Sequence, residues 1–364
     1  MVLCIRGCSK DDEAVIPEAA VTLAPTFEPT PTPTVKVKVE LPALENAKYR
    51  PTAKEGWLPV FRQAIGMTEK CIAITVDDCF QAGNMRSIME LVMEYGGKLT
   101  FFPIGKNALL TEQGKILREA YANGMEIENH TYTHNGLYGG TDEELAQEIY
   151  TEQLVLSYVL GVDYTCHFLR PRGGDARNDQ RIHAYISQLG NYYGIAHWST
   201  VYEDSYQSLT DGLEPGAIYL FHTTDKDLEM LRRFIPYAYS QGYTFVTLNE
   251  MFGCPENEVR PLTEPITVDT SLAPALEPYE TVLVELKRGN YLYAVKVLQS
   301  RLIELGWLEG GADGVFGELT EAAVKAVQAY LGLEADGKAS VSLQELLYSD
   351  SAPRNTVLTD EGSL

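Results

Sequence analysis

Two adjacent aspartates, Asp77 and Asp78, end an apolar, strand-like run in the segment CIAITVDDCF. Neighbouring carboxylates at the end of a core strand are costly to bury unless a cation lies beside them. A turn in which an aspartate caps a helix would also explain the pair. The first question that the sequence raises is therefore which cation this pair could hold.

Two histidines four residues apart, His130 and His134, occur in the segment ENHTYTHN. On a helical turn this spacing places both imidazoles on one face, within reach of a single ion. For the histidine pair alone, a solvated turn is the alternative, and the spacing by itself does not favour the metal site. Together with the aspartates, it predicts a His₂Asp metal site with an open coordination position, which is the pattern of catalytic rather than structural zinc.

The segments that must position these residues alternate between strand-like and helix-like patterns over residues 45–254. The strand-like runs are IAITV, LTFFPIG, MEIEN, HFLRP, YGIAHWS, AIYLFH and TFVTL. Helical patterns lie between several of them, and one opens with a capping box formed by Thr141 and Glu144. This alternation predicts an α/β fold with a parallel sheet. Polar residues follow the carboxyl ends of many runs, and we therefore expect a closed barrel, in which those ends converge on one face.

The segment from about Ile72 to Leu248 resembles the NodB-homology polysaccharide deacetylases, carbohydrate esterase family 4. The matching motifs, in order, are TVDD (75–78), HTYTH (130–134), RPRGG (170–174), WSTVYED (198–204) and LFH (220–222). Five motifs in the family's order are a stronger signal than any one of them. The resemblance implies the family's distorted (β/α) barrel and a metal-dependent hydrolase that removes N-acetyl groups from amino sugars.

The resemblance also implies a metal ion and its ligands. Asp78, His130 and His134 are the expected ligands of one divalent ion. Zinc is the expected metal, with cobalt or nickel able to substitute.

Further roles follow from the same motifs. The expected catalytic residues are Asp77 as general base, Arg170 as the cation that orients it, His222 as general acid and Asp204 as the residue that tunes His222. Gly173, Trp198 and Leu220 are expected at the oxyanion site and the substrate groove. The implied products are acetate and a free amino sugar.

The chain departs from the family's motifs at several positions. Cys79-Phe80 stands where Gly-Pro or Gly-Tyr is usual, and Arg172-Gly173 stands where an aromatic residue usually walls the sugar groove. In the fourth motif, Val201 replaces an aspartate and Ser205 a tryptophan. Cys79 could be an additional ligand, or simply a small buried residue. These departures concern the fit of the substrate more than the chemistry.

A second folded body is expected at residues 281–349, because two linker-like segments imply two folded bodies, and it contains an internal half-repeat. VKVLQ is followed by ADG in the first half, and VKAVQ is followed by ADG in the second. The segment resembles the helical peptidoglycan-binding domain of cell-wall hydrolases. A generic three-helix bundle used for dimerisation is the alternative.

The two resemblances together imply a substrate. A wall-binding domain beside a deacetylase points to peptidoglycan, although xylan or chitin-type polymers remain alternatives. A catalytically inactive wall-binding protein is the rival class of function. The complete set of matching ligand and catalytic residues favours an enzyme over this rival.

The remaining segments and the total charge bear on location and partners. The formal net charge of −22 argues against a nucleic-acid partner. Residues 1–44 resemble a bacterial lipoprotein start, with Cys8 as the acylation site, followed by a Thr/Pro-rich spacer. Only MVLCI precedes Arg6, which is short for a signal peptide, so a disordered intracellular N-terminus is the alternative. We expect an extracytoplasmic protein at the cell surface or wall, a flexible linker at 255–280 and a polar tail at 350–364.

Overall fold

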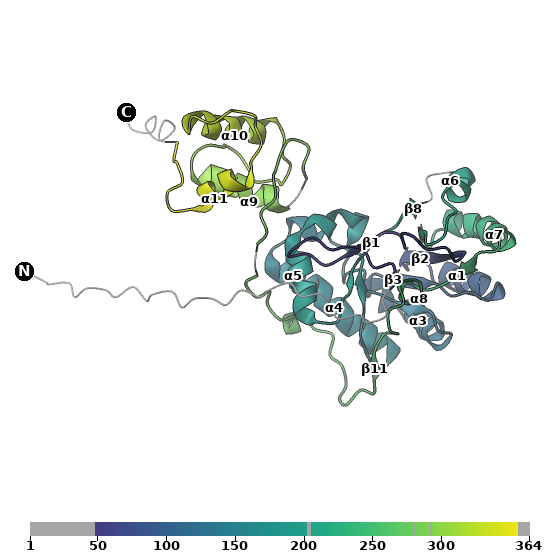
Figure 1. Cartoon of the computed structure of the whole chain (residues 1–364). Coiled ribbons are helices and arrows are strands. Elements are labelled where there is room, and N and C mark those ends of the chain that lie inside the picture. Colours follow the sequence, from purple (N-terminus) through teal and green to yellow (C-terminus); the bar gives the residue numbers. More distant parts are fainter. Residues whose placement is uncertain (1–47, 202–204, 280, 292, 356–364) are drawn as a thin grey trace, which may run out of the picture. The chain divides into compact units, whose positions relative to one another are not determined.

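The computed structural model describes residues 48–201, 205–279, 281–291 and 293–355. The larger domain is built around parallel strands (Figure 1). These strands are β1 (Val60–Phe61), β2 (Cys71–Asp78), β3 (Thr100–Pro103), β4 (Glu126–Ile127), β6 (Phe168–Leu169), β7 (Gly194–Ala196), β8 (Thr200–Val201), β9 (Ile218–His222) and β10 (Thr244–Phe245). Each strand-like run predicted from the sequence contains one of them.

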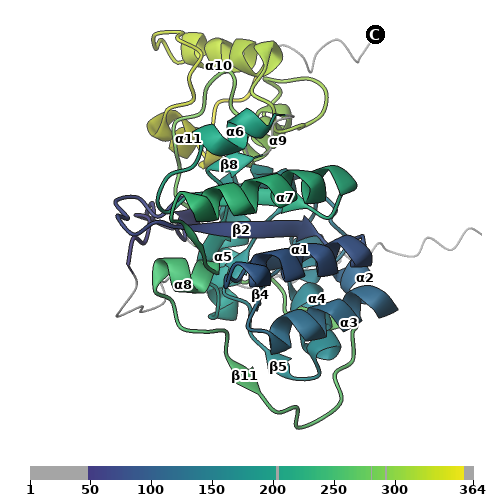
Figure 2. The ribbon, with the colours of Figure 1, turned by 90° about the vertical axis from the view of Figure 1, so that its right-hand side faces the viewer.

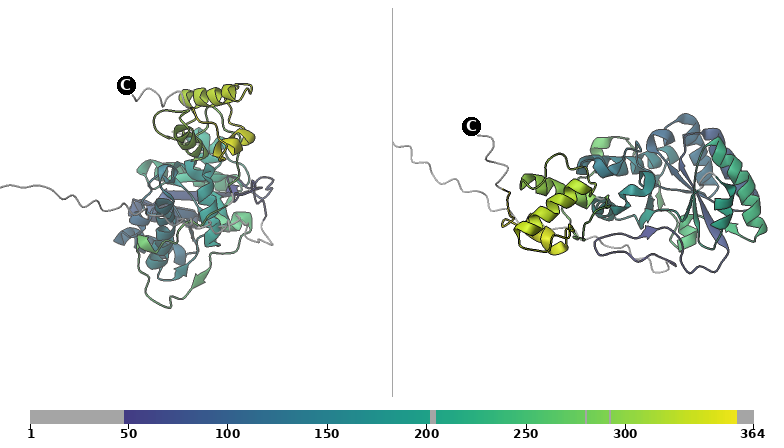
Figure 3. Two further views of the ribbon diagram at one scale, coloured as in Figure 1. Left: turned by 90° about the vertical axis from the view of Figure 1, so that its left-hand side faces the viewer. Right: turned by 90° about the horizontal axis from the view of Figure 1, so that it is seen from above.

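The strands form two sheets that together make a distorted barrel. One sheet has the order β4-β3-β2-β9-β8, with β10 also paired to β2, and the other has the order β1-β7-β6. Isolated bridges join the sheets, a parallel one between Asn129 and Leu169 and an antiparallel one between Gln63 and Ala217. The right-hand view of Figure 3 shows helices outside these strands. The predicted barrel is confirmed, and it is distorted because single bridges replace full ladders at two seams.

Helices cover the outer surface of the barrel. They are α1 (Ala82–Glu94), α2 (Gly105–Ala108), α3 (Thr111–Ala122), α4 (Asp142–Leu160), α5 (Gln180–Leu189), α6 (Tyr206–Asp211), α7 (Asp225–Ser240) and α8 (Leu248–Phe252). In Figure 2, α1 and α7 run alongside β2. The predicted capping box is present at the start of α4. Thr141 Oγ1 accepts a hydrogen bond from the Glu144 backbone N–H (3.1 Å), and the Glu144 carboxylate accepts one from the Thr141 N–H (2.7 Å).

Alternation along the strands separates an inner from an outer hydrophobic cluster. On β2, Ile72 and Ile74 pack in the cluster beneath the helices, whereas Ala73 belongs to the cluster inside the barrel. Phe61 is central to the inner cluster, with its ring centroid 5.1 Å from that of Phe168 and 4.8 Å from that of Phe252. The inside of the barrel is therefore a packed core, which holds the carboxyl ends of the strands in place.

Residues 255–278, which we call the strap, differ from the flexible linker expected from the sequence. Within the strap, β11 (Val259–Arg260) pairs antiparallel with β5 (Asp163–Tyr164). Asn257 Nδ2 donates to the Glu128 carboxylate (2.7 Å) and to the Thr165 carbonyl (2.9 Å). Further along, the Tyr185 hydroxyl donates to the Pro274 carbonyl (2.9 Å). The expectation of flexibility is wrong here, because the polar residues of the strap bond to the barrel instead of to water.

The small domain contains α9 (Tyr293–Glu304), α10 (Glu318–Tyr330) and α11 (Val341–Tyr348) and has a hydrophobic cluster of its own. Its half-repeat has a structural basis. The buried side chain of Gln299 accepts a hydrogen bond from the Gly314 N–H (2.7 Å) and donates to Asp313 (2.8 Å). Gln328, Gly337 and Asp336 repeat these contacts at 2.9 and 2.7 Å. Both glycines have positive φ (77° and 78°), which explains why the ADG motif recurs.

The small domain extends beyond residue 349. Trp307 Nε1 donates to the Pro353 carbonyl (2.6 Å), and the Asn355 N–H donates to the Leu305 carbonyl (2.9 Å). Residues 350–355 of the expected polar tail therefore belong to the domain, and the rest of the tail lies outside the described residues, as does the lipoprotein-like segment with Cys8. Within the described residues, no helix combines the length and apolar character needed to cross a membrane.

Candidate active site

The twin aspartates lie at the carboxyl end of β2, between β3 and β9. Asp77 faces His222 of β9 and Phe102 of β3 in the strand register, and Asp78 faces Pro103. Asp77 is 3% exposed, whereas Asp78 is only partly buried. Since β2 is buried from Ile72 to Val76, the core fixes where both carboxylates project.

Asp78, His130 and His134 come together as the sequence predicts. Their candidate ligand atoms all lie within 4.8 Å of one another. Nε2 of His130 is 3.3 Å, and Nε2 of His134 3.6 Å, from Asp78 Oδ1. This oxygen is buried and accepts no hydrogen bond of normal geometry from any described residue. A buried carboxylate oxygen beside two imidazoles, without a donor, fits the ligand set of a divalent metal ion.

The protonation states of this group suit metal binding. Burial alone would raise the pKa of Asp78. Its interactions with His130, and then with His134, have the larger combined effect, so the pKa of Asp78 is lowered. Burial, followed by the charge of His130, lowers the pKa of His134 to about 4. A carboxylate and a neutral imidazole are the forms that ligate a metal at neutral pH.

His130 is oriented by a contact on its other ring nitrogen. Nδ1 lies 2.6 Å from the carbonyl oxygen of Arg170, which can only accept, so Nδ1 carries the proton. Nε2 faces Asp78 and is the candidate ligand atom. Burial alone would lower the pKa of His130, but the charges of Asp77 and Asp78 raise it overall, so a metal ion would replace a proton on this nitrogen. A backbone carbonyl in this position is a common device for fixing the tautomer of a metal-binding histidine.

The segment with both histidines is held by α4. The Glu148 carboxylate accepts hydrogen bonds from the N–H (2.9 Å) and the hydroxyl of Thr133, and its carbonyl accepts one from the Tyr132 N–H (3.0 Å). One turn later on α4, Glu152 is fully buried, and neither of its carboxylate oxygens has a hydrogen-bond partner among the described residues. A methyl group at Gly105 would overlap this carboxylate. The absence of a side chain at Gly105 therefore allows α2 to approach Glu152, beneath the segment that carries both histidines.

Left-handed backbone conformations concentrate around the ligands. The non-glycine residues with positive φ in the described part of the chain are Tyr49 (56°), Asp78 (66°), Cys79 (56°), Thr131 (68°) and His134 (62°). All except Tyr49 are ligands or lie next to one. Such residues cluster at functional sites, where surrounding contacts offset the strain. The position of Cys79 also explains why glycine is usual there in the family that the motifs resemble.

Cys79 is a buried neutral thiol and not a member of the ligand group. Its side chain is inaccessible, and burial raises its pKa well above the usual range. Its Sγ contacts the Val76 carbonyl at 3.8 Å. The reading of a small buried residue therefore fits the structure better than that of an additional ligand.

Asp77 forms a buried ion pair with Arg170. The guanidinium Nη1 is 2.7 Å from Asp77 Oδ1 and also donates to Thr75 Oγ1 (2.8 Å), and Nη2 donates to the His197 carbonyl (3.0 Å). Arg170 is inaccessible to solvent, and its guanidinium carbon lies 4.0 Å from the centroid of the Phe102 ring. These contacts fix the guanidinium, which in turn holds Oδ1 and leaves Oδ2 available.

His222 has an acidic partner that sequence reasoning missed. Asp227 Oδ2 is 3.8 Å from His222 Nδ1 and accepts hydrogen bonds from the His222 N–H (3.2 Å) and the Thr224 hydroxyl (2.7 Å). Asp227 lies in the first turn of α7, where the capping threonine fixes it, and that cap was the signal available in the sequence. The expected partner, Asp204, lies outside the described residues.

The three groove residues differ in exposure. Gly173 is exposed with φ 60°, at the start of a 3₁₀ segment (Arg172–Asn178). Trp198 is partly exposed and stacks on His197, with ring centroids 4.1 Å apart. Leu220 is 5% exposed. Gly173 and Trp198 can therefore be reached from solvent, whereas Leu220 could contact only a small group inserted deeply.

Parts of the chain match known protein families and relatives. Residues 64–194 match the family "Polysaccharide deacetylase", and residues 293–347 match the family "Putative peptidoglycan binding domain". The chain is 27% identical to a peptidoglycan-N-acetylglucosamine deacetylase of Bacillus cereus over 194 residues, which are 50% of this chain and 68% of that protein. It is 24% identical to the peptidoglycan-N-acetylmuramic acid deacetylase PdaA of Bacillus subtilis over 195 residues, which are 50% of this chain and 72% of that protein.

The solved structure of Bacillus subtilis PdaA, a family 4 carbohydrate esterase, also aligns, with a TM-score of 0.45 and 22% identity over 57% of this chain and 84% of that chain. By the two family matches, the chain contains a region of the polysaccharide deacetylase type, followed by a region of the peptidoglycan-binding type.

Proposed function

We propose that this protein is a metal-dependent hydrolase that removes N-acetyl groups from amino sugars of peptidoglycan. The observation that supports this most directly is the gathering of Asp78, His130 and His134 beside an ion-paired Asp77 at the barrel's carboxyl-end face. That face is where the active sites of (β/α) barrels lie.

Asp78, His130 and His134 would hold the metal ion, and we propose zinc. When bound, such an ion polarises an amide carbonyl and makes water easier to deprotonate at neutral pH. The donor set of two imidazoles and one carboxylate is typical of catalytic zinc, and cobalt or nickel could replace it.

Asp77 is the proposed general base. Its Oδ1 is held by Arg170, so Oδ2 can accept a proton from the water that adds to the acetamide carbon. Arg170 keeps this carboxylate ionised and oriented, and acts as a positioning residue. The backbone N–H of Gly173 is the proposed hydrogen-bond donor to the developing oxyanion.

His222 is the proposed general acid. It faces Asp77 across the β2–β9 register and is 40% exposed at its side chain, so it can reach the sugar nitrogen. Donation of its proton to the nitrogen lets the carbon–nitrogen bond break, which releases acetate and a free amine. Asp227 orients the imidazole, and Asp204 stays a prediction as a second partner.

Peptidoglycan is the proposed substrate for two reasons. The relatives named above act on that polymer, and a peptidoglycan-binding-type domain follows the barrel in this chain. We infer action outside the cytoplasm, at the cell wall, and lipid attachment through Cys8 stays a prediction. Deacetylation of xylan or chitin-type polymers is the alternative activity, and an inactive wall-binding protein is the alternative class.

One assay separates these candidates. Acetate release is measured from peptidoglycan sacculi, acetylated xylan and chitin oligomers with the zinc-loaded full-length protein. Release from sacculi well above that from xylan is the expected result. Faster release from xylan would indicate that xylan, and not peptidoglycan, is the substrate. No release from any polymer with metal bound would favour the inactive wall-binding protein.

A further inference from the structure

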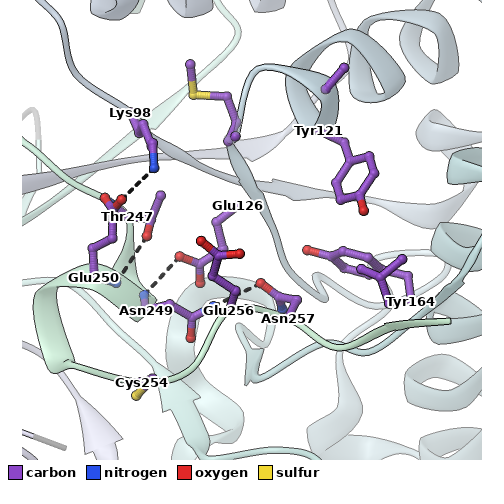
Figure 4. Close-up of a pocket in the computed structure, with 14 residues that line it drawn as sticks. Lys98, Tyr121, Glu126, Tyr164, Thr247, Asn249, Glu250, Cys254, Glu256 and Asn257 are labelled. Atoms are coloured by element: carbon purple, nitrogen blue, oxygen red, sulfur yellow. Dashed lines mark hydrogen bonds and ion pairs between the residues drawn. The ribbon is translucent and has the colours of Figure 1, made fainter.

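Side-chain amides join separate segments of the chain at both ends of the barrel. In the pocket at the amino ends of the strands, Asn249 Nδ2 donates to the side-chain oxygen of Asn257 at 2.9 Å (Figure 4). At the carboxyl ends, Asn107 Nδ2 donates to the backbone carbonyl of Asp78 at 2.8 Å. The first bond ties the strap to the barrel, whereas the second acts on a proposed metal ligand.

Asn107 belongs to α2, which lies between the two loops that carry the proposed ligands. The Gly105 N–H donates to the Thr131 carbonyl (3.1 Å), and the Lys106 N–H donates to the Tyr132 carbonyl (2.9 Å). Both acceptors lie between the two histidine ligands in the sequence. The helix therefore holds the segment that carries the histidines through its backbone, and holds the loop after β2 through the side chain of Asn107.

The carbonyl that Asn107 binds belongs to a residue with unusual backbone geometry. Asp78 has φ 66°, and Thr131, whose carbonyl is bound by Gly105, has φ 68°. Left-handed conformations are unfavourable for residues other than glycine and persist where surrounding contacts hold them. A change of Asp78 to a right-handed conformation would rotate its peptide group and turn the carbonyl away from Asn107. The hydrogen bond thus favours the left-handed form, in which the Asp78 carboxylate lies beside both histidines.

The amide of Asn107 is the better placed of two donors to the Asp78 carbonyl. The backbone N–H of Ile104 also points to this oxygen, but its nitrogen is 3.3 Å away, which is longer than the usual range. The bond from Asn107 goes to the backbone of Asp78 and not to its carboxylate. It therefore does not compete with an ion for the carboxylate oxygens.

Helix propensity does not explain an asparagine at position 107. Asparagine is less favourable than alanine in a helix, because its side chain forms hydrogen bonds with nearby backbone groups instead. Here the side chain forms such a bond with a different segment, the loop after β2. Asn107 is also partly buried, so water competes less for its amide. The contact with Asp78 supplies a structural reason for this residue.

A second side-chain amide holds the same loop at a different point. Gln113 Nε2 of α3 donates to the Phe80 carbonyl at 2.9 Å. Phe80 is not a proposed ligand, and its φ is not positive. The two amides therefore form bonds of the same kind and of similar length, but only the bond from Asn107 acts on a ligand.

We propose that Asn107 is a positioning residue of the metal site, which holds Asp78 in the left-handed conformation and so directs its carboxylate toward His130 and His134. The inference rests on the proposed function, since it requires these three residues to bind the ion. A preorganised ligand binds more tightly, because less of the binding free energy is used to order it. Loss of an outer partner of a metal ligand typically weakens metal binding by about 10–100-fold.

The test measures the zinc affinity of the full-length protein by competition with a chelator, and the visible absorption spectrum with cobalt in place of zinc. Asn107→Ala should weaken zinc binding at least about tenfold and shift the cobalt bands, because Asp78 no longer keeps one orientation. Asn107→Leu keeps the bulk of the side chain without its donor and should have the same effect. Gln113→Ala is the matched control and should equal the parent in both measurements. Circular dichroism of the metal-free proteins checks folding.

Several results would overturn this inference alone. Zinc affinity and a cobalt spectrum of Asn107→Ala equal to those of the parent would show that Asp78 needs no such support. Equal losses in Asn107→Ala and Gln113→Ala would indicate an effect of general order in the loop. Full affinity in Asn107→Leu would indicate packing instead of a hydrogen bond, and failure of both Asn107 variants to fold would indicate a role in the whole domain.

Failure of the proposed function would give a different result. A parent protein that binds no zinc, or whose zinc binding survives His134→Ala, would show that the ion is not held by Asp78, His130 and His134. That result would overturn the proposed metal site and, with it, the role of Asn107.

Discussion

Asp77 and His222 lie opposite each other on the neighbouring parallel strands β2 and β9. Paired residues of a ladder project to the same side of a sheet, so one strand register places the proposed base and acid together. The same register pairs the four preceding residues of β2, beginning at Ala73, with the four preceding residues of β9, beginning at Ile218. All of these residues are buried. A slip by one residue would turn these side chains to the opposite face, so packing of the core fixes the catalytic pair.

The twin aspartates can be separated by substitution. Asp77→Asn should keep the metal and lower turnover by about 10²–10⁴-fold, because it removes a general base. Asp78→Asn should lose the metal, because it removes a ligand. Metal content after dialysis and acetate release are the measurements, and circular dichroism checks folding, since Asp77→Asn leaves Arg170 without its buried partner. A folded but metal-free Asp77→Asn protein would show that the two roles are reversed.

Asp227 should affect catalysis through His222 alone. Asp227→Asn removes a negative charge 3.8 Å from His222 Nδ1 but keeps an acceptor for the His222 backbone N–H, and we expect kcat to fall by about tenfold, which corresponds to about 1.4 kcal/mol of transition-state stabilisation. KM and metal content should not change. Asp225→Asn is the matched control, because Asp225 lies in the same turn of α7 but accepts a hydrogen bond from Asn84 (2.8 Å). Equal losses in both variants would indicate damage to the helix terminus instead.

Glu152 should make stability depend on pH. Burial raises its pKa well above the usual range, so above about pH 4.5 the folded state keeps a proton that the unfolded state releases. Stability is then full at low pH and falls as pH rises toward the folded-state pKa, by at most about 1.4 kcal/mol per pH unit. Glu152→Gln removes this loss. Its Tm should exceed that of the parent at pH 8, and the difference should shrink toward pH 4.

The control for this experiment is Glu143→Gln, an exposed change on the same helix. Its Tm should follow that of the parent at every pH. Parallel Tm curves for the parent and Glu152→Gln between pH 4 and pH 8 would contradict the assignment of a buried neutral acid.

The small domain should matter only on the insoluble polymer. Truncation after Pro278 keeps the strap and should leave turnover on small soluble oligosaccharides unchanged while reducing it on sacculi, because the local concentration of enzyme falls. Truncation after Cys254 removes Asn257 from Glu128 and should also lower Tm. The isolated small domain should co-sediment with sacculi and not with xylan. Equal activity on sacculi with and without it, and no co-sedimentation, would favour the dimerisation alternative.

Arg172 is expected to influence which amino sugar is preferred. It is exposed and forms no hydrogen bond or ion pair with a described residue, and its charge contributes to the lowered pKa of His134. Muramic acid that carries no stem peptide bears a free lactyl carboxylate that glucosamine lacks, so the comparison uses peptide-free glycan strands. Arg172→Ala should therefore lower kcat/KM for N-acetylmuramic acid units about tenfold more than for N-acetylglucosamine units, and Arg172→Lys should retain part of the preference. An unchanged ratio in Arg172→Ala would exclude this role.

The sequence was informative where a local pattern determines the structure. The apolar run of β2 ends at the aspartates as predicted. His130 and His134 both lie beside Asp78, but the segment that carries them is a loop with left-handed residues at Thr131 and His134, not the helical turn that their spacing indicated. The order of motifs then predicted which distant segments meet. Thr141 and Glu144 predicted the start of α4 for the same local reason.

The sequence was uninformative where tertiary contacts decide. The strap has the polar, proline-containing composition of a linker, and only its partners on the barrel, such as Glu128, make it ordered. β1, β5, β8 and β11 have two residues each, too few to show a period. Asp227 resembles any acidic residue in a first helical turn, and its position beside His222 depends on how α7 leaves β9.

The left-handed residues around the ligands have a consequence for how the protein gains and loses its ion. Asp78, Cys79, Thr131 and His134 each hold a conformation that costs about 1–2 kcal/mol more than the right-handed one. A bound ion adds to the contacts that offset this cost. Removal of the ion by a chelator should therefore let the loop after β2 and the loop after β4 leave their left-handed conformations. We expect hysteresis: metal would leave rapidly with chelator, whereas activity would return after zinc is added back in a slow, first-order phase whose rate does not depend on zinc concentration.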